Sequence, residues 1–351
     1  MIDMELFNGI NQEKLDDILS RIKNVKIALI GDICLDVYWR ADMTKSELSR
    51  ETPHFPLPIV KEWMSPGGGG NAAANIAALL PESIKVLGVI GRDWRGDSLI
   101  RKLQELGIDT DSIVVSEKAV TNAYCKPLRI GISHMEYEDP RMDFNNYENL
   151  PQEDEEKLLE LLGQCASDID VLCVCDQLLY GCITPMVREK IMSLAKEGLK
   201  VIVDSRDRID LYTGVILKPN EVEGTRALYK EAIPEKLSFE DYINAAKILS
   251  QRNRSNVCMT LGAKGCVYAD SQTIIHIPSY DVSPPIDICG AGDTFLSAFS
   301  CAIAAGVAPY EAASFANLAA DITIKKVGIT GTANPEEIRT RHEQIFYQNN
   351  G

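Results

Sequence analysis

The feature that most constrains this fold is an alternation of short apolar runs with segments of helical periodicity. The runs lead to Gly, Asp or Asn, as strands buried on both faces of a parallel sheet do. They span residues 25–32, 84–93, 170–177, 199–206 and 214–220. Helical periodicity covers 70–80, 95–106, 152–164, 184–196 and 239–251. This alternation predicts an α/β fold, a doubly wound and mostly parallel sheet with helices on both faces.

Other segments extend or interrupt this pattern. Two strands around a glycine turn are expected at 255–270 and 273–278. Helices are expected at about 10–23, from 293 to about 305, at 309–325 and at 335–347. Residues 37–62 and 119–148 are extended and contain proline, which predicts a small β lid over the mouth of the sheet; two long surface loops are the alternative. We expect one domain over residues 1–351.

The composition limits the kinds of molecule that this protein is expected to bind. The chain has 351 residues and a net charge of −15, so its surface should repel nucleic acid and anionic membranes. The ten cysteines contain no Cys-x-x-Cys pair and the four histidines do not cluster, which argues against a Cys/His metal site and favours a reducing compartment. The N-terminus lacks signal-peptide features, and no apolar run is long enough to span a bilayer. These observations predict a cytoplasmic protein.

The stretch DICGAGDTF, residues 287–295, places two aspartates around a Gly-Ala-Gly turn. Apolar residues with helical spacing follow, so the turn is expected at a helix N-terminus, where free N–H groups and the helix dipole favour an anion. Gly290, Ala291 and Gly292 could then approach a phosphate, and Asp293 could accept a hydroxyl proton beside it. From these residues alone, a helix cap by Asp293 explains the pattern equally well.

This stretch resembles the C-terminal signature of the ribokinase-like (PfkB-type) carbohydrate kinases, Asp-Thr-x-Gly-Ala-Gly-Asp-x-Phe. Further stretches resemble motifs of that family in the same order: GDICLD at 31–36, GGGGNAAANIA at 67–77, KPNEVE at 218–223 and TLGAKG at 260–265. The resemblance covers about residues 25–345. It implies a ribokinase-like fold and ATP-dependent phosphorylation of a sugar hydroxyl.

The resemblance also implies roles for individual residues. Asp293 resembles the catalytic base, and Gly290–Gly292 resemble the anion hole. The substrate side would comprise Asp32, Asp36, Gly68, Gly69, Asn71 and Asn75. The nucleotide side would comprise Lys218, Asn220, Glu223, Thr260, Gly262, Gly265 and Asn317. Structural alternatives exist: Asp32 could close a turn, Asn71 and Asn75 could cap and pack a helix, and Asn220 with Glu223 could form a capping box.

Cofactors follow from the same resemblance. ATP and Mg²⁺ are implied, with Glu223 reaching the Mg²⁺ through water. Asp287 resembles part of the monovalent-cation loop of many members, which would bind K⁺. Ile288 stands where that loop usually has threonine, so the dependence on K⁺ stays open.

A narrower resemblance concerns residues 30–79, which are similar to the kinase half of the bacterial ADP-heptose synthesis enzymes, including their Gly-Asp-x-x-Leu-Asp-x-Tyr-Trp start. It implies D-glycero-D-manno-heptose 7-phosphate as the substrate, phosphorylated at the anomeric hydroxyl. A substrate phosphate needs arginine or lysine. The lid segments offer Lys126 and Arg129, with Arg141, Arg50 and Lys45 as further candidates; any one of them could equally be a solvated lid charge.

Other functions stay open. A ribokinase- or fructokinase-type enzyme acting on an unphosphorylated sugar would not need the lid cations. A catalytically silent sugar or nucleotide sensor would not need an intact Asp293. A dehydrogenase is disfavoured because no Gly-x-Gly-x-x-Gly follows the first strand. Apolar lid residues such as Phe55, Leu57 and Ile59 predict a homodimer formed through the lids.

Overall fold

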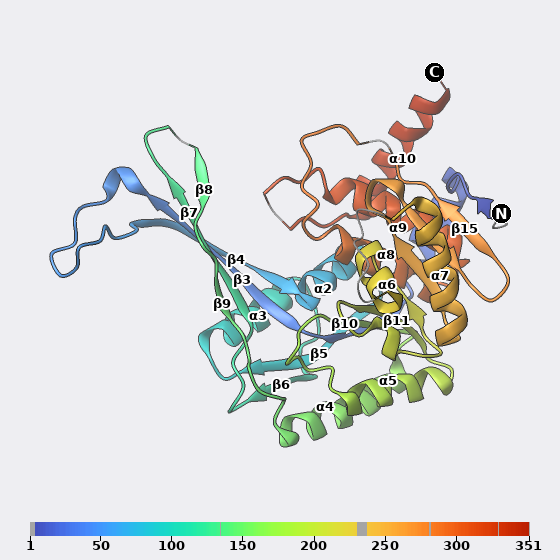
Figure 1. The fold of residues 1–351 in the computed structure, drawn as a ribbon, viewed down its shortest axis with the longest axis horizontal. Helices are drawn as coiled ribbons and strands as arrows, with labels where there is room; N and C mark the ends of the chain where they lie inside the picture. The colour runs from blue at the N-terminus through green and yellow to red at the C-terminus, as the bar shows by residue number, and fades with distance from the viewer. Residues whose placement is uncertain (1–3, 134, 230–236, 281, 329, 351) are drawn as a thin grey trace.

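Two β-sheets organise the molecule (Figure 1). The structure, a computed structural model, describes residues 4–133, 135–229, 237–280, 282–328 and 330–350. Residue 134, inside the second predicted lid segment, and residues 1–3 and 351, at the ends of the predicted domain, lie outside the described residues. One sheet is flanked by helices, and the other projects from it.

The larger sheet has ten strands among the described residues. In spatial order they are β1 (Glu5–Leu6), β15 (Ile274–Ile277), β14 (Cys266–Ala269), β13 (Asn256–Thr260), β12 (Ile216–Leu217), β11 (Lys200–Ser205), β10 (Val171–Asp176), β2 (Lys26–Gly31), β5 (Ser83–Gly91) and β6 (Ile113–Ser116). Neighbouring strands are parallel except where β14 pairs with β13 and β15. The predicted mostly parallel sheet is confirmed.

Side chains of this sheet alternate between two apolar cores. In β2, Ile27 and Leu29 pack into one buried cluster, whereas Ala28 and Ile30 pack into the other, because successive strand residues point to opposite faces. Helices cover both clusters, so the central strands place apolar residues on both of their faces. This explains the continuous apolar runs of the sequence.

Helices cover both faces of the sheet. The first cluster is covered by α1 (Gln12–Ile22), α2 (Gly69–Ala78), α3 (Trp94–Glu105), α8 (Ala291–Ala304), α9 (Pro309–Thr323) and α10 (Pro335–Asn350). The second is covered by α4 (Gln152–Cys165), α5 (Pro185–Lys196), α6 (Glu221–Leu228) and α7 (Phe239–Asn253). Short 3-10 helices occupy Met43–Lys45, Ala166–Asp168, Ile209–Leu211 and Gly262–Lys264. None of the described helices is long and apolar enough to cross a membrane.

The second sheet is built from the two segments that interrupt the alternation. Its strands are β4 (Ile59–Gly68), β3 (Ile33–Asp42), β7 (Ala123–Ile130) and β8 (Glu136–Glu138) in spatial order, with β9 (Met142–Phe144) also pairing with β7. We call it the lid sheet. β3 is antiparallel to β4 and parallel to β7. In Figure 1 its far end, with the connection between β3 and β4, extends well away from the helices.

Candidate active site

The Gly-Ala-Gly turn lies at the N-terminus of α8. Gly290 caps the helix with φ of +81°, and a Cβ built there would lie 2.9 Å from Thr330 Cγ2 and 3.0 Å from Asn71 Nδ2. Only glycine meets both the conformation and the space. A Cβ built on Gly292 would have Lys218 Nζ as its nearest neighbour, at 3.9 Å. The first-turn amides of α8 and the Lys218 ammonium therefore border the same space, as an anion hole requires.

Asp293, in the first turn of α8, is held by the helix that follows the glycine run. The Asn71 amide donates to Asp293 Oδ2 at 2.6 Å. Asn75 in turn donates to the Asn71 carbonyl at 3.0 Å and accepts from the Thr294 hydroxyl at 2.9 Å. Both asparagines are buried, so this network aligns α2 with α8 and fixes the carboxylate. The two asparagines thus pack the helices, and Asn71 also touches the carboxylate expected to act as base.

The surroundings of Asp293 suit a carboxylate that exchanges a proton near neutral pH. Burial, with the negative charge of Asp204, raises the pKa of Asp293 to about 6 from an ordinary value of 3.8. The Asn71 hydrogen bond and the Lys218 charge act in the opposite direction. A base of this pKa is ionised at pH 7 yet basic enough to accept a hydroxyl proton.

A buried lysine and two carboxylates lie beside Asp293. Lys218 Nζ is 3.0 Å from Asp204 Oδ2, and the lysine side chain is only 2% exposed. Burial would lower the pKa of Lys218, but the charges of Asp204 and Glu223 outweigh it and raise the pKa. Burial and the neighbouring Asp204 raise the pKa of Glu223 to about 7. The Lys218 ammonium therefore stays charged. One of the two acids can hold a proton near neutral pH, and it would release that proton when a cation binds nearby.

Three of the predicted nucleotide residues, Asn220, Glu223 and Thr260, lie at the N-terminus of α6. Asn220 caps this helix: its side chain accepts from the Glu223 amide at 2.8 Å, and Glu223 Oε2 accepts from the Asn220 amide at 2.9 Å. This is the capping box considered from the sequence. Thr260, the last residue of β13, forms a β-bridge with Asn220. The Asn-x-x-Glu motif and the Thr-Leu-Gly-Ala-Lys-Gly motif thus lie side by side.

Three other predicted nucleotide residues shape the turn after β13. Gly262 has φ of +54°, and a Cβ built there would meet nothing within 4 Å, whereas a Cβ on Gly265 would lie 2.2 Å from the Ile277 carbonyl oxygen. The buried Asn317 on α9 donates to the carbonyls of Ile277 and Pro278, each at 3.3 Å. Asn317 therefore fixes the chain beside this turn.

Asp36, in β3 of the lid sheet, is buried among groups from neighbouring strands. Its carboxylate lies 3.3 Å from Lys126 Nζ, and that ammonium also donates to the Tyr38 hydroxyl at 3.0 Å. Burial raises the pKa of Asp36 despite the opposing charge of Lys126. A Cβ on Gly67 would lie 3.0 Å from the Asp36 carboxylate, so the glycine run leaves room for this acid.

Asp32 is placed differently from Asp36. Its carboxylate accepts three hydrogen bonds of 2.7–2.8 Å from the backbone N–H groups of Gln177, Leu178 and Cys182. Its own carbonyl accepts from the Gly69 amide at 2.9 Å and would be 2.7 Å from a Cβ on Gly68. The Asp32 carboxylate closes the loop after β10, and the two glycines allow the chain to pass close by.

The predicted lid cations separate onto different surfaces. Lys126 and Arg129 are three residues apart on β7, which continues without a bulge, so they point to opposite faces. Arg129 pairs with Asp139 at 2.6 Å. Arg141 pairs with Asp143 through two bonds of 2.6 and 2.7 Å, and its charge acts on Asp36. Lys126 and Arg141 therefore lie near the buried acid, and Arg129 does not.

A cavity of about 670 Å³ follows the face of the lid sheet that carries Lys126. It is lined by Tyr38, Arg40, Lys61, Trp63, Leu128, Glu136, Glu138 and Gly328. Tyr38 stacks on Trp63 with ring centroids 5.1 Å apart. Arg40 Cζ and Lys61 Nζ lie 5.4 and 5.2 Å from the Trp63 centroid. Of the remaining candidates, Lys45 pairs with Asp42 and Arg50 is exposed, both in the connection after β3.

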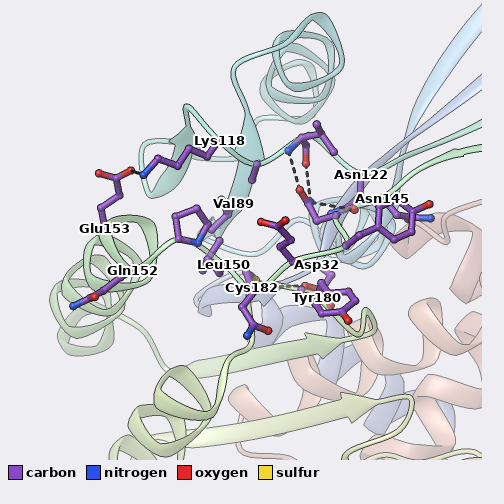
Figure 2. A pocket seen from close by; sticks show the side chains of 18 of the residues that line it. Asp32, Val89, Lys118, Asn122, Asn145, Leu150, Gln152, Glu153, Tyr180 and Cys182 are labelled. Carbon is purple, nitrogen blue, oxygen red and sulfur yellow. Dashed lines mark hydrogen bonds and ion pairs between the residues drawn. The ribbon is translucent and has the colours of Figure 1, made fainter.

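A larger cavity, of about 810 Å³, lies beside the sheet below the lid (Figure 2). Its wall includes Asp32, Asn122, Tyr180 and Cys182 together with residues 145–153. Asp293 and Lys218 do not line it. This cavity is thus separate from the cluster around the base.

The segment of the predicted monovalent-cation site lies against the chain after α9. Asp287 accepts from the backbone amides of Cys289 and Gly328, both at 3.0 Å. The Ile288 side chain is 75% exposed. Within the described part of the chain, no group of three or more His, Cys, Asp or Glu side chains has the arrangement of a metal site. K⁺ binding stays a prediction.

Two residues beside the proposed site residues, Asp204 and Tyr38, were not predicted from the sequence. Asp204 follows the apolar residues of the run at 199–206, and its position near the carboxyl end of a parallel strand was an available signal. Tyr38 lies in a segment expected to be lid, and only the pairing of β3 with β7 places it beside Lys126.

Comparison with known proteins shows the family to which the chain belongs. The model of the pfkB family of carbohydrate kinases matches residues 26–337. The chain is 30% identical over 317 residues to the bifunctional protein HldE of Sulfurimonas denitrificans, covering 89% of this chain and 63% of that protein. It is 29% identical over 334 residues to HldE of Trichlorobacter lovleyi, covering 93% and 65%. The chain thus spans less than two thirds of the length of these relatives.

Solved structures show the same fold. Arabidopsis thaliana ribokinase complexed with ribose and ATP matches with a TM-score of 0.66 and 20% identity, over 91% of this chain and 99% of that one. Escherichia coli phosphofructokinase-2 in complex with potassium matches with a TM-score of 0.69 and 20% identity, over 92% and 99%. The predicted ribokinase-like fold is confirmed. Since the family model matches nearly the whole chain, this protein belongs to the pfkB family of carbohydrate kinases.

Proposed function

We propose that this protein transfers the γ-phosphoryl group of ATP to a hydroxyl of a sugar phosphate. The observation that carries this proposal is Asp293, a base with a pKa of about 6 set beside a glycine-rich helix N-terminus and the Lys218 ammonium. Asp293 accepts the hydroxyl proton as the sugar oxygen bonds to phosphorus. The bond from phosphorus to the bridging oxygen breaks, and ADP leaves. The α8 amides and Lys218 stabilise the negative charge of the transferring group.

The second substrate is ATP with its Mg²⁺. Its phosphates would extend from α8 toward α6, and its base toward the turn at Thr260–Gly265. Glu223, whose pKa is raised by burial, is suited to meet a hydrated Mg²⁺ because the cation favours its ionised form. Mg²⁺ would neutralise the phosphates, whereas Lys218, held in place by its ion pair with Asp204, would contact them directly.

Positive charge on the lid sheet supports a phosphorylated sugar. We assign the sugar contact to Asp36 rather than Asp32, whose carboxylate is committed to three backbone amides. Lys126 and Arg141 act electrostatically on Asp36, and arginine and lysine are the side chains that bind a phosphate. With the resemblance of residues 30–79, this favours D-glycero-D-manno-heptose 7-phosphate, phosphorylated at the anomeric position.

One observation favours an unphosphorylated sugar instead. Lys126 already pairs with Asp36 at 3.3 Å, and Arg141 pairs with Asp143. Lysine and arginine side chains that already pair with lid carboxylates would bind a substrate phosphate less strongly. A kinase of the ribokinase or fructokinase type is therefore the second candidate. A silent sensor is disfavoured, since the base and its glycine turn are intact.

ADP release from Mg-ATP, measured over a panel of sugars and sugar phosphates, distinguishes these substrates. With a heptose 7-phosphate, we expect Lys126→Met to raise KM about 10- to 100-fold, the value of one charge-assisted phosphate contact. Arg129→Met removes an equal charge from the opposite face of β7 and should leave KM unchanged. Turnover only with unphosphorylated sugars, unaffected by Lys126→Met, would favour the second candidate.

We further propose that the enzyme is cytoplasmic and forms a homodimer through its lid sheets. Exposed apolar residues gather on the lid and its connection: Leu48, Phe55, Leu57, Ile59 and Val60 are each at least 39% exposed. A dimer would cover them and pair the β edges of the lid.

A further inference from the structure

A cavity of about 390 Å³ lies at the N-terminus of α5 and adjoins the cavity of Figure 2, with which it shares the lining residues Asn149, Leu150, Tyr180 and Gly181. Arg188, Arg208, Thr184, Glu155 and Leu179 are among its lining residues. None of the residues proposed for catalysis, for ATP or for the sugar lines it. Its chemistry therefore needs an explanation of its own.

Arg188 is the feature that points to a ligand. Arg188 is only 8% exposed, and its buried Nη1 atom has no hydrogen-bond partner among the described residues. Within the same residues, no carboxylate oxygen lies within 4.0 Å of its guanidinium. The guanidinium stands 5.7 Å from the Tyr212 ring centroid, and the Tyr212 hydroxyl donates to Asp176 at 2.9 Å. A buried cation without an anionic partner is costly and calls for one.

The helix end adds to the attraction for an anion. Thr184 caps α5 by accepting from the Val187 amide at 3.2 Å, and Pro185 has no N–H. Because Pro185 has no N–H and the Val187 N–H is bonded to Thr184, the Met186 amide is the first-turn donor that neither feature accounts for. The dipole of the 12-residue helix also points its positive end toward this cavity.

Arg208 provides a second, fixed positive group. It donates to both oxygens of the buried Asp176 and to the Leu178 and Leu179 carbonyls. One feature opposes an anion: the Glu155 carboxylate, which accepts from the Thr184 hydroxyl. Glu155 is the one acid among the residues that line the cavity, whereas the Asp176 carboxylate lies beneath it and is already paired with Arg208.

We propose that this cavity binds a small molecule through a carboxylate or phosphate monoester group, with Arg188 as its charged partner. A guanidinium pairs with either group through two parallel N–H···O bonds. The cavity has room for a small metabolite rather than a bare ion. The site is distinct from the catalytic centre and does not depend on the proposed substrate.

Thermal unfolding with inorganic phosphate or acetate as the probe tests this proposal. With either anion at about ten times its dissociation constant, we expect the Tm of the wild type to rise by about 1–3 °C through this site. Arg188→Met should abolish that rise. Lys126→Met removes a cation from the proposed catalytic cleft. It should leave unchanged the part of the Tm rise that depends on Arg188. An anion-dependent rise that is equal in the wild type and in Arg188→Met overturns the proposal.

A gain of affinity provides a second test that misfolding cannot imitate. Glu155→Gln keeps an oxygen acceptor for Thr184 and removes the opposing charge, so phosphate should bind about five- to tenfold more tightly at low ionic strength. Titration calorimetry measures this change. An unchanged phosphate affinity in Glu155→Gln would count against the site, and Arg188→Lys should recover only part of the wild-type affinity, because lysine lacks the planar fork.

Discussion

At the residue scale, the ionisation of Asp293 is subject to opposing requirements. Asp293 must be ionised to act as a base, yet burial and Asp204 favour its protonated form, so its pKa rises to about 6. In the unfolded chain the same acid would have its ordinary pKa of 3.8. The folded protein therefore holds a proton that the unfolded chain releases, and ionisation of Asp293 opposes folding increasingly as the pH rises from 4 to 6. The proposed base is thus retained at a cost in the free energy of unfolding, as is common at active sites.

This cost can be measured with Asp293→Asn. The amide cannot ionise and can still accept the Asn71 hydrogen bond, so the variant should have a free energy of unfolding higher by about 1–2 kcal/mol at pH 8. The gain should shrink as the pH falls below 6, because the wild-type acid then becomes neutral as well. Denaturant unfolding at pH 5 and pH 8 provides both values. A variant that is less stable than the wild type at pH 8 would contradict this account of Asp293.

At the scale of elements, the site depends on places where two backbones approach closely. The turn between β13 and β14 contains two glycines with positive φ in different surroundings. A Cβ on Gly265 would meet the Ile277 carbonyl oxygen at 2.2 Å, whereas a Cβ on Gly262 would meet nothing within 4 Å. The strain of positive φ applies to both residues, and the clash applies only to Gly265.

Alanine at these positions should therefore separate the two effects. Gly262→Ala should lower the free energy of unfolding by about 1 kcal/mol, the cost of a left-handed alanine. Gly265→Ala should lower it by about 3 kcal/mol or more, because the Ile277 backbone must also move. Urea unfolding of the two variants measures the difference. Equal losses would mean that the approach of Gly265 to β15 does not matter.

The same scale shows what the sequence could and could not predict. The apolar runs predicted the central strands, because strands covered on both faces need continuous apolar residues. The eight-residue α6 was indicated only by its possible capping box, and the four-residue β6 was not predicted, since neither element is long enough to show a period. The separation of Lys126 from Arg129 was predictable from their odd spacing on a strand. The distinction between Asp32 and Asp36 was not, because it depends on backbone amides about 145 residues further along the chain.

At the scale of the whole molecule, the lid sheet projects from the body with apolar residues on its surface (Figure 1). A monomer would leave these residues and the lid edges in water. Two copies joined through their lids would bury them, while the catalytic cluster stays on the α/β sheet of each copy.

Light scattering tests this arrangement. The wild type at micromolar concentration should have about twice the chain mass of 38.8 kDa. Ile59→Asp, at the start of β4, should shift the mass toward the monomer, because a charge placed in an apolar interface is unpaired. Leu106→Asp, a change of similar exposure at the end of α3, should leave the dimer intact. A wild type that is entirely monomeric would contradict the proposed interface.

The central claim is that Asp293 is the base of a sugar kinase, and the pH dependence of turnover tests it most directly. We would measure ADP release from Mg-ATP with a heptose 7-phosphate in the wild type and in Asp293→Asn. The account predicts that wild-type kcat/KM falls tenfold per pH unit below about pH 6, the pKa of Asp293. It also predicts that Asp293→Asn lowers kcat by about 10²–10⁴-fold while ATP still binds. A variant that retains wild-type turnover, or a wild-type rate that stays constant down to pH 4, would show that another group accepts the proton.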